Sequence, residues 1–351
     1  MTAMTDIVEQ VRAAAAQQSP LVIRGGGSKD FLGRRTHGTP LDAGGLRGIV
    51  RYEPTELVIT AQAGTPLADI EAALAERGQM LGFEPPHYGL GATLGGTIAC
   101  GLSGPARPFR GAARDFVLGA KIVNGKGEVL SFGGEVMKNV AGYDVSRLMC
   151  GAYGTLGVLL EISLKVLPRP AHELSLVLEV NEQDAFENMN AWQRDPLPLS
   201  GLCYDGDRLH VRLSGAEPAV SAARRRIGGE VDTQGAGFWE RLREQRGAFF
   251  DGGGELWRLS VPPTTRASVI GGKQFIDWGG ALHWYKTTQN ATAIFAAAQA
   301  VGGHAARWRG DARAAQIFQP LPAPLQALHR RLKQAFDPHG LFNPGRLYPE
   351  F

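Results

Sequence analysis

Cysteine is scarce in this sequence of 351 residues, which contains only Cys100, Cys150 and Cys203. These residues lie far apart, and none forms the CxxC spacing that is typical of zinc and redox sites. The sequence therefore argues against a disulfide framework and against a self-contained zinc or iron–sulfur centre, and we expect no metal site. Such cysteine usage favours a reducing compartment.

Net charge and long apolar runs are also lacking. The 37 basic and 34 acidic residues leave a formal net charge of +3, which is too small to indicate a nucleic-acid-binding surface. The most apolar stretch, residues 155–167, contains Glu161 and Lys165 and is shorter than the ~20 residues of a membrane helix. A signal peptide begins with a basic segment that is followed by an apolar core. The N-terminus of this chain carries Asp6 and Glu9 and lacks both segments, so we expect no signal peptide. These absences predict a cytoplasmic protein, or at most one that lies peripherally at a membrane through a partner.

Glycine, by contrast, is abundant. It makes up 47 of the 351 residues, whereas an average composition contains about 7% glycine. Because 44% of the chain is hydrophobic and only 20% is charged, a disordered glycine-rich chain is excluded, and no three-residue collagen period is present. We therefore expect loops that another group approaches closely, above all in residues 1–170, which hold 27 of the glycines.

The apolar patterns predict two α+β parts with a boundary at Pro168 and Pro170. In the first part we expect a helix from Thr5 to before Pro20, a helix over 66–77, a long loop over 82–104, and strands over 21–23, 48–52, 57–62, 116–123, 128–132 and 158–167. The strict alternation of residues 158–167 predicts one well-buried face.

The second part is predicted to be an antiparallel sheet with helices on one face. We expect strands over 174–180, 209–213, 257–261 and 281–285, and helices over 216–227 and 288–300. Residues 325–336 predict an amphipathic helix with Leu325, Leu328, Leu332 and Phe336 on one side.

Three glycine clusters need a physical explanation: residues 24–29, 93–104 and 151–157. The first follows a predicted strand, and its consecutive backbone N–H groups can form an anion-binding nest. The familiar nucleotide motifs do not fit, because Asp30 stands where the Rossmann motif needs glycine, and Gln274 follows Gly271-Gly272-Lys273 where a P-loop needs Ser or Thr.

The clusters do resemble a known family. Arg24-Gly-Gly-Gly-Ser28, Thr93-Leu-Gly-Gly96 and Gly151-x-x-Gly-Thr-Leu-Gly157 have the order and spacing of the vanillyl-alcohol-oxidase (PCMH-type) FAD-binding domain, and Asp337–Gly345 resembles the C-terminal signature of its FAD-linked oxidases. The resemblance implies an α+β fold, with a PCMH-type FAD-binding domain of two α/β subdomains over 1–170. It further implies a smaller cap domain with an antiparallel sheet and flanking helices over 171–330, and a segment over 331–351 that returns to the FAD domain.

Residues 138–144, 256–259 and 277–280 look like those of the FAD-binding subunits of bacterial glycolate oxidases. This resemblance implies a complex with a larger FAD-binding catalytic subunit and an iron–sulfur subunit, which oxidises the 2-hydroxy acid glycolate to glyoxylate. Any membrane contact would come through these partners.

The resemblance also implies a site for FAD, which we expect to be noncovalent because the first glycine cluster lacks histidine. The pyrophosphate would lie between two groups of residues: Arg24, Gly25, Gly26, Gly27, Ser28 and Lys29 on one side, and Thr93, Gly95, Gly96 and Gly101 on the other. The remaining contacts would be Gly151, Gly154 and Gly157 along the cofactor, Ile162 at the adenine and Asn343 near the flavin ring. The alternative is that these glycines form turns without a ligand and that Ile162 is a plain core residue.

No catalytic residue can be assigned from the sequence. Related 2-hydroxyacid dehydrogenases carry a His-x-Gly-Asp-Gly-Asn-x-His run, to which the nearest match is residues 307–311, without histidine. The positions where relatives hold the substrate carboxylate are Met137 and Ala141. His283 is a candidate base or a surface or core-edge histidine, and Arg258 would bind a carboxylate or form a salt bridge. The alternatives to a complex subunit are a stand-alone FAD oxidoreductase of a hydroxy acid or sugar and a non-catalytic assembly subunit.

Overall fold

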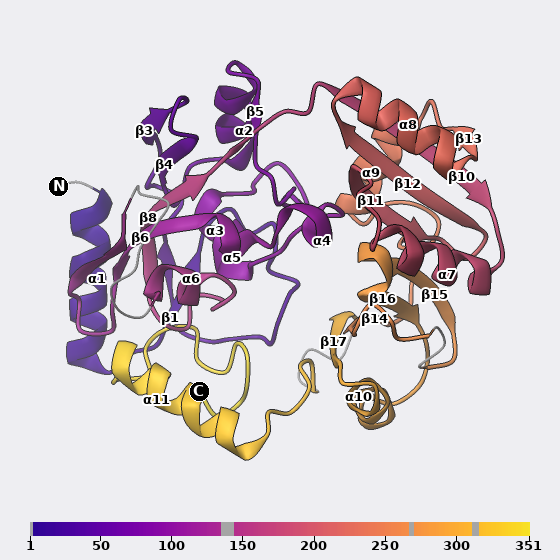
Figure 1. Cartoon of the computed structure of the whole chain (residues 1–351). Coiled ribbons are helices and arrows are strands. Elements are labelled where there is room, and N and C mark those ends of the chain that lie inside the picture. The colour runs from indigo at the N-terminus through magenta and orange to yellow at the C-terminus, as the bar shows by residue number, and fades with distance from the viewer. Residues whose placement is uncertain (1–2, 135–143, 267–269, 311–315) are drawn as a thin grey trace. The chain divides into compact units, whose positions relative to one another are not determined.

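A computed structural model describes residues 3–134, 144–266, 270–310 and 316–351 of the chain (Figure 1). The chain divides into two compact units. Unit 1 comprises Met1–Ser103, Ala112–Arg169 and Pro320–Phe351, and unit 2 comprises Gly104–Gly111 and Pro170–Gln319. The chain therefore crosses between the units four times.

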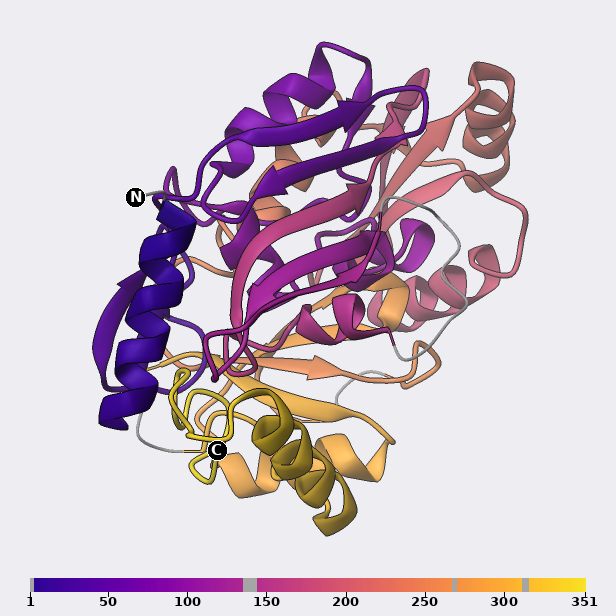
Figure 2. The same cartoon turned by 90° about the vertical axis from the view of Figure 1, so that its left-hand side faces the viewer.

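Unit 1 is built on a five-stranded antiparallel sheet and a two-stranded parallel sheet. Its strands are β1 (Leu21–Arg24), β2 (Thr39–Asp42), β3 (Ile49–Glu53), β4 (Val58–Gln62), β5 (Gln79–Met80), β6 (Val117–Val123), β7 (Val129–Gly133), β8 (Val158–Lys165) and β9 (Leu167–Pro168). The larger sheet has the order β3-β4-β8-β6-β7. The helices are α1 (Ala3–Gln17), α2 (Leu67–Ala75), α3 (Leu94–Cys100), α5 (Ala113–Phe116), α6 (Val145–Met149) and α11 (Ala323–Phe336). Figure 2 views this unit with α1 and the large sheet in front.

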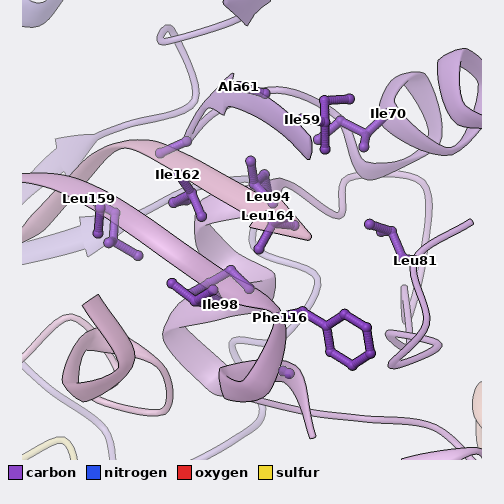
Figure 3. Close-up of a cluster of buried hydrophobic side chains, with 14 of the residues drawn as sticks. Ile59, Ala61, Ile70, Leu81, Leu94, Ile98, Phe116, Leu159, Ile162 and Leu164 are labelled. Carbon is purple, nitrogen blue, oxygen red and sulfur yellow. The ribbon is translucent and has the colours of Figure 1, made fainter. Parts of the chain in front are cut away.

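Two hydrophobic cores meet at strand β8. Val158 and Leu160 lie in the core around α1, β1 and β2, whereas Leu159 and Ile162 lie in the core between the large sheet, α2 and α3 (Figure 3). The pairing with β6 is irregular at this point, which leaves Leu160 as an extra residue. The predicted strict alternation along residues 158–167 is therefore wrong at its start, because the bulge turns the strand and both of its faces are covered.

Helix α3 lies within residues 82–104, where we predicted a long loop. It begins at Thr93, whose hydroxyl accepts a hydrogen bond from the N–H of Gly96 at 3.3 Å, and ends at Gly101 with φ of 64°. Two of its seven residues are glycines, which disfavour helices. The burial of Leu94 and Ile98 in the core outweighs this low propensity (Figure 3).

Unit 2 is built on one antiparallel sheet with the strand order β13-β10-β12-β11-β15-β16-β14-β17. The strands are β10 (His172–Glu179), β11 (Leu199–Tyr204), β12 (Arg208–Gly215), β13 (Glu230–Val231), β14 (Leu256–Ser260), β15 (Lys273–Asp277), β16 (Leu282–Lys286) and β17 (His304–Arg309). The helices are α4 (Arg107–Arg110), α7 (Glu182–Trp192), α8 (Glu217–Ile227), α9 (Gly235–Arg243), α10 (Ala291–Ala300) and the 3-10 turn η1 (Trp278–Gly280).

We predicted that the helices of unit 2 lie on one face of its sheet. This prediction is wrong, because helices cover both faces. Helices α7, α8 and α10 cover the face that carries Val211, Ile276 and Tyr285. Helix α9 lies on the opposite face, where Phe238 stacks on His210 with ring centroids 3.9 Å apart. The sheet therefore has a second face, rich in polar and aromatic side chains, that the alternation along its strands did not reveal.

Helix α11 buries only part of the face that we predicted, because Phe336 packs against the core of unit 1 and the leucines near the start of the helix do not. Leu325 and Leu328 are 47% and 42% exposed, whereas Lys333 is buried. The ammonium group of Lys333 donates hydrogen bonds of 2.8 Å to the carbonyls of Thr155 and Phe342 and to the carboxylate of Asp337. These polar contacts and the packing of Phe336 together set the orientation of the helix.

Candidate functional site

The first glycine cluster follows β1 and presents a row of backbone donors. Within the described part of the chain, the N–H groups of Gly25, Gly26, Gly27 and Ser28 donate no hydrogen bond. Unbonded consecutive N–H groups are the donor set of an anion-binding nest. The cluster can therefore accept a phosphate-like anion.

The first glycine cluster packs directly against the backbone at Gly91 and the side chain of Thr93. This close contact requires glycine at positions 25 and 26. A Cβ on Gly26 would lie 1.4 Å from the carbonyl oxygen of Gly91, and a Cβ on Gly25 would lie 2.6 Å from the hydroxyl of Thr93. In return, a Cβ on Gly91 would lie 2.6 Å from the carbonyl oxygen of Gly26. The two backbones can approach this closely only because no side chain separates them.

The two cations that flank the first cluster already have partners in the chain. Arg24 forms a salt bridge with Asp30. Lys29 is buried, and its ammonium group donates to the carbonyl of His87 at 3.2 Å. Lys29 thus ties the cluster to the loop that contains Gly91, while its positive charge stays beside the nest.

The second and third clusters are also neighbours. A Cβ on Gly101 would lie 3.0 Å from the Cα of Gly151. The N–H of Gly151 donates to the carbonyl of Ile98 at 3.0 Å, and the N–H of Tyr153 donates to Ala99 at 2.8 Å. These bonds fix the third cluster to the end of helix α3.

Asn343 joins the third cluster to the strand before the first. Its side-chain oxygen accepts from the N–H of Ile23 at 2.9 Å, and its amide nitrogen donates to the carbonyl of Tyr153 at 2.7 Å. Its own N–H donates to Leu21 at 3.0 Å, and a Cβ on Gly154 would lie 2.8 Å from its amide nitrogen. The chain itself uses both ends of this side chain. Asn343 therefore positions the glycine loops, and a contact with the flavin ring stays a prediction.

The other predicted residues occupy packing positions. Gly95 lies against Ala63, Gly96 against Thr93 and Gly157 against Val123, with tight Cβ distances of 2.8, 3.2 and 2.9 Å. Ile162 is fully buried in the core that Figure 3 shows. Their cofactor contacts stay predictions. Residues 137–143 and Asp311 lie outside the described residues.

Two residues of this region were not predicted from the sequence. One is Gly91, whose carbonyl meets Gly26. The other is Thr97, whose buried hydroxyl has no hydrogen-bond partner in the described part of the chain. In the sequence, Thr97 could have been noticed only because its hydroxyl directly follows the motif Thr93-Leu-Gly-Gly. An orphan buried hydroxyl needs a polar partner, which a bound cofactor could supply.

The site contains no activated thiol. Burial raises the pKa of Cys100 to about 11 and that of Cys150 to about 12, so both thiols stay protonated at neutral pH. Among the described residues, no group of His, Cys, Asp and Glu side chains could hold a metal ion, and no helix there is long and apolar enough to cross a membrane. The chemistry that this region can support is the binding of an extended anionic ligand along backbone donors.

His283, our candidate base, lies in unit 2 and is completely buried. Its ring nitrogens face the carbonyl of Gly280 at 3.1 Å and the hydroxyl of Tyr285 at 3.4 Å. Burial lowers its pKa to about 4. His283 is therefore a neutral core residue and not a surface histidine, and its burial makes it a weak base.

This burial predicts a pH-dependent stability. As pH falls from about 6.5 to about 4, His283 takes up a proton in the unfolded chain but not in the folded one, so the folded state loses about 3 kcal/mol. Above pH 6.5 the contribution is fully present. Urea unfolding of the chain and of His283→Gln at several pH values checks this, because the free energy of unfolding of the parent chain should fall relative to that of the variant as the pH drops through that window. Parallel curves would contradict it.

Comparisons with known proteins agree with this geometry. A model of the FAD binding domain family matches residues 2–133. The glycolate oxidase subunit GlcE of Escherichia coli K12 is 55% identical over 98% of this chain and 97% of its own length. The glycolate oxidase subunit GlcD of Bacillus subtilis is 30% identical over 53% of this chain and 39% of its own length.

Two solved structures share the fold at low sequence identity. p-Cresol methylhydroxylase with bound substrate has a TM-score of 0.69 at 14% identity and covers 99% of this chain and 87% of its own. Alkyldihydroxyacetonephosphate synthase has a TM-score of 0.68 at 15% identity and covers 97% of this chain and 74% of its own. The predicted α+β, PCMH-type fold is thereby confirmed.

Proposed function

The chain belongs to the family of the glycolate oxidase subunit GlcE, and we propose that it is the FAD-binding subunit of a glycolate oxidase complex. The observation that carries the proposal is the 55% identity along nearly the whole of both chains. The complex would oxidise glycolate to glyoxylate with a larger catalytic flavin subunit and an iron–sulfur subunit. We further propose that the chain is cytoplasmic and meets the inner membrane only through these partners.

The glycine loops of unit 1 fit FAD. When bound, FAD accepts and passes on electrons. The free N–H groups of residues 25–28 would hold its pyrophosphate, with the positive charge of Lys29 beside them. Thr97 would supply a hydroxyl, and the closely packed backbones at Gly26 and Gly101 would exclude water from the phosphates. We expect FAD to be noncovalent, because no histidine stands in the first cluster.

Unit 1 would therefore be the FAD-binding domain and unit 2 the cap. The glycine loops carry the donors of a cofactor cradle, whereas burial makes His283 a weak base and keeps both cysteines of the cradle protonated. This division supports a role in which the subunit binds FAD while the larger subunit performs the oxidation.

Expression of the chain alone and together with its two partners tests the proposal. The chain alone should be yellow, release FAD on acid denaturation, and fail to reduce an artificial electron acceptor with glycolate. All three subunits together should copurify and oxidise glycolate. A colourless chain that takes up no FAD would refute the flavoprotein assignment, and turnover by the chain alone would support a stand-alone oxidoreductase instead.

A further inference from the structure

Helix α11 carries a row of apolar side chains at the surface of unit 1. Leu325 and Leu328 are 47% and 42% exposed, Ala335 is exposed as well, and Leu332 is half-buried. Residues that are three, four or seven positions apart lie on one side of a helix, so these four side chains form one row. This row, which we call the leucine stripe, is the kind of contiguous apolar surface that marks an interaction site.

The leucine stripe cannot turn inward, because the adjoining side of α11 is fixed to unit 1. Lys333 holds this side with three hydrogen bonds of 2.8 Å, and Phe336 packs against the core. The C-terminal residues lie beside α11, where the amide of Gln326 donates to the carboxylate of Glu350 at 2.9 Å (Figures 1 and 2). One side of the helix is thus anchored while the stripe beside it faces outward.

The charged groups of α11 all have one sign. The helix carries Arg330, Arg331 and Lys333 and no acidic residue. Lys333 is buried, whereas both arginines are exposed and have no ion-pair partner among the described residues. Arg331 follows Leu328 by three residues, so it lies beside the leucine stripe. A surface that complements this side of α11 therefore needs an apolar groove with a carboxylate next to it.

This arrangement favours a different protein over a second copy of the chain or a bilayer. Two copies paired about a two-fold axis would bring their Arg331 side chains to one interface, where like charges repel. A helix that lies in a bilayer surface buries a broad apolar face. Part of the apolar face of α11 already packs on unit 1 through Phe336, which leaves only a narrow row for a partner.

We propose that the leucine stripe and Arg331 dock another subunit of the complex, at an apolar groove with a carboxylate beside it. The identity of the partner as a subunit rests on the proposed function, whereas the docking surface rests on the exposure and charge of α11. Lys333 of the same helix bonds to the carbonyl of Thr155 in the third glycine cluster at 2.8 Å. The docked subunit would therefore sit on the element that supports the cofactor loops.

The test coexpresses the tagged full chain with the larger flavin subunit and the iron–sulfur subunit and measures how much of each is captured. The double variant Leu325→Gln, Leu328→Gln should lower capture at least about tenfold, and Arg331→Glu should lower it too. Arg330→Glu makes the same change of charge on another side of the helix and should lower capture less. Val129→Gln replaces a 45% exposed apolar side chain elsewhere in unit 1 and should leave capture unchanged.

Loss of docking is distinguished from loss of folding by FAD content and by the urea midpoint. Both should match the parent chain in the double variant, because the two leucines are exposed. If the double variant fails to fold, Arg331→Glu decides the question at an exposed position.

Unchanged capture of both subunits by the folded double variant would overturn the docking proposal and leave the proposed function intact. Leucine-dependent binding to vesicles of anionic phospholipid, or leucine-dependent dimerisation of the chain, would also overturn it and assign the stripe to a membrane or a second copy. Capture of neither subunit by the parent chain would instead refute the proposed function, and the docking of a subunit with it.

Discussion

Replacement of Gly26 by alanine is expected to weaken FAD binding strongly. The added Cβ would lie 1.4 Å from the carbonyl oxygen of Gly91 and 2.5 Å from its carbonyl carbon, so one of the two backbones must move. Any movement displaces the row of free N–H groups at residues 25–28. We expect FAD affinity to fall at least a hundredfold, or about 2.7 kcal/mol, as measured by fluorescence titration of the apoprotein.

Gly45→Ala is the matched control. A Cβ on Gly45 would meet only the Cβ of Ala3, at 4.0 Å, so this variant should bind FAD like the parent chain. Circular dichroism distinguishes loss of the cofactor from loss of the fold. Full FAD affinity in a folded Gly26→Ala variant would mean that the cofactor does not lie on this loop.

Lys333→Met is expected to cause the largest loss of stability. It leaves the completely buried carboxylate of Asp337 without its counter-charge, although this group still accepts from the N–H groups of Leu341 and Phe342 at 2.9 and 2.7 Å. Removing one partner of a buried ion pair costs about 3–5 kcal/mol. The free energy of unfolding in urea measures this loss.

Two further variants make the second prediction specific. Adding Asp337→Asn to Lys333→Met removes the uncompensated charge and should restore part of the lost stability. Arg51→Met breaks an exposed pair with Glu53, at 3.1 Å, and should cost less than about 1 kcal/mol. A loss for Lys333→Met as small as that for Arg51→Met would show that the buried pair does not hold the C-terminal segment.

The sequence predicted the elements whose apolar pattern is regular. The strands over 57–62 and 116–123 and the helix over 216–227 lie within one residue of β4, β6 and α8. Helix α3 was missed because its glycines hide the helical pattern. The buried face of α11 was predicted only in part, at Phe336, because a lysine, which normally faces water, is buried there with a carboxylate.

The glycine clusters could be found in the sequence. The contacts between them could not be predicted from it. Gly26 touches Gly91 through backbone atoms, and Asn343 bonds to Ile23 across 320 residues of chain. Backbone contacts leave no mark in a hydrophobic pattern.

The segment Gly104–Gly111 limits how the two units can be separated. Ser103 and Ala113, on either side of it, are joined by a hydrogen bond of 2.9 Å within unit 1, whereas Phe109 packs into a core of unit 2. A fragment of residues 170–319 would lack this insert and expose the apolar surface that it covers. Neither unit can therefore be transplanted as one continuous piece of chain, and an exchange of either unit must carry over all of its segments together.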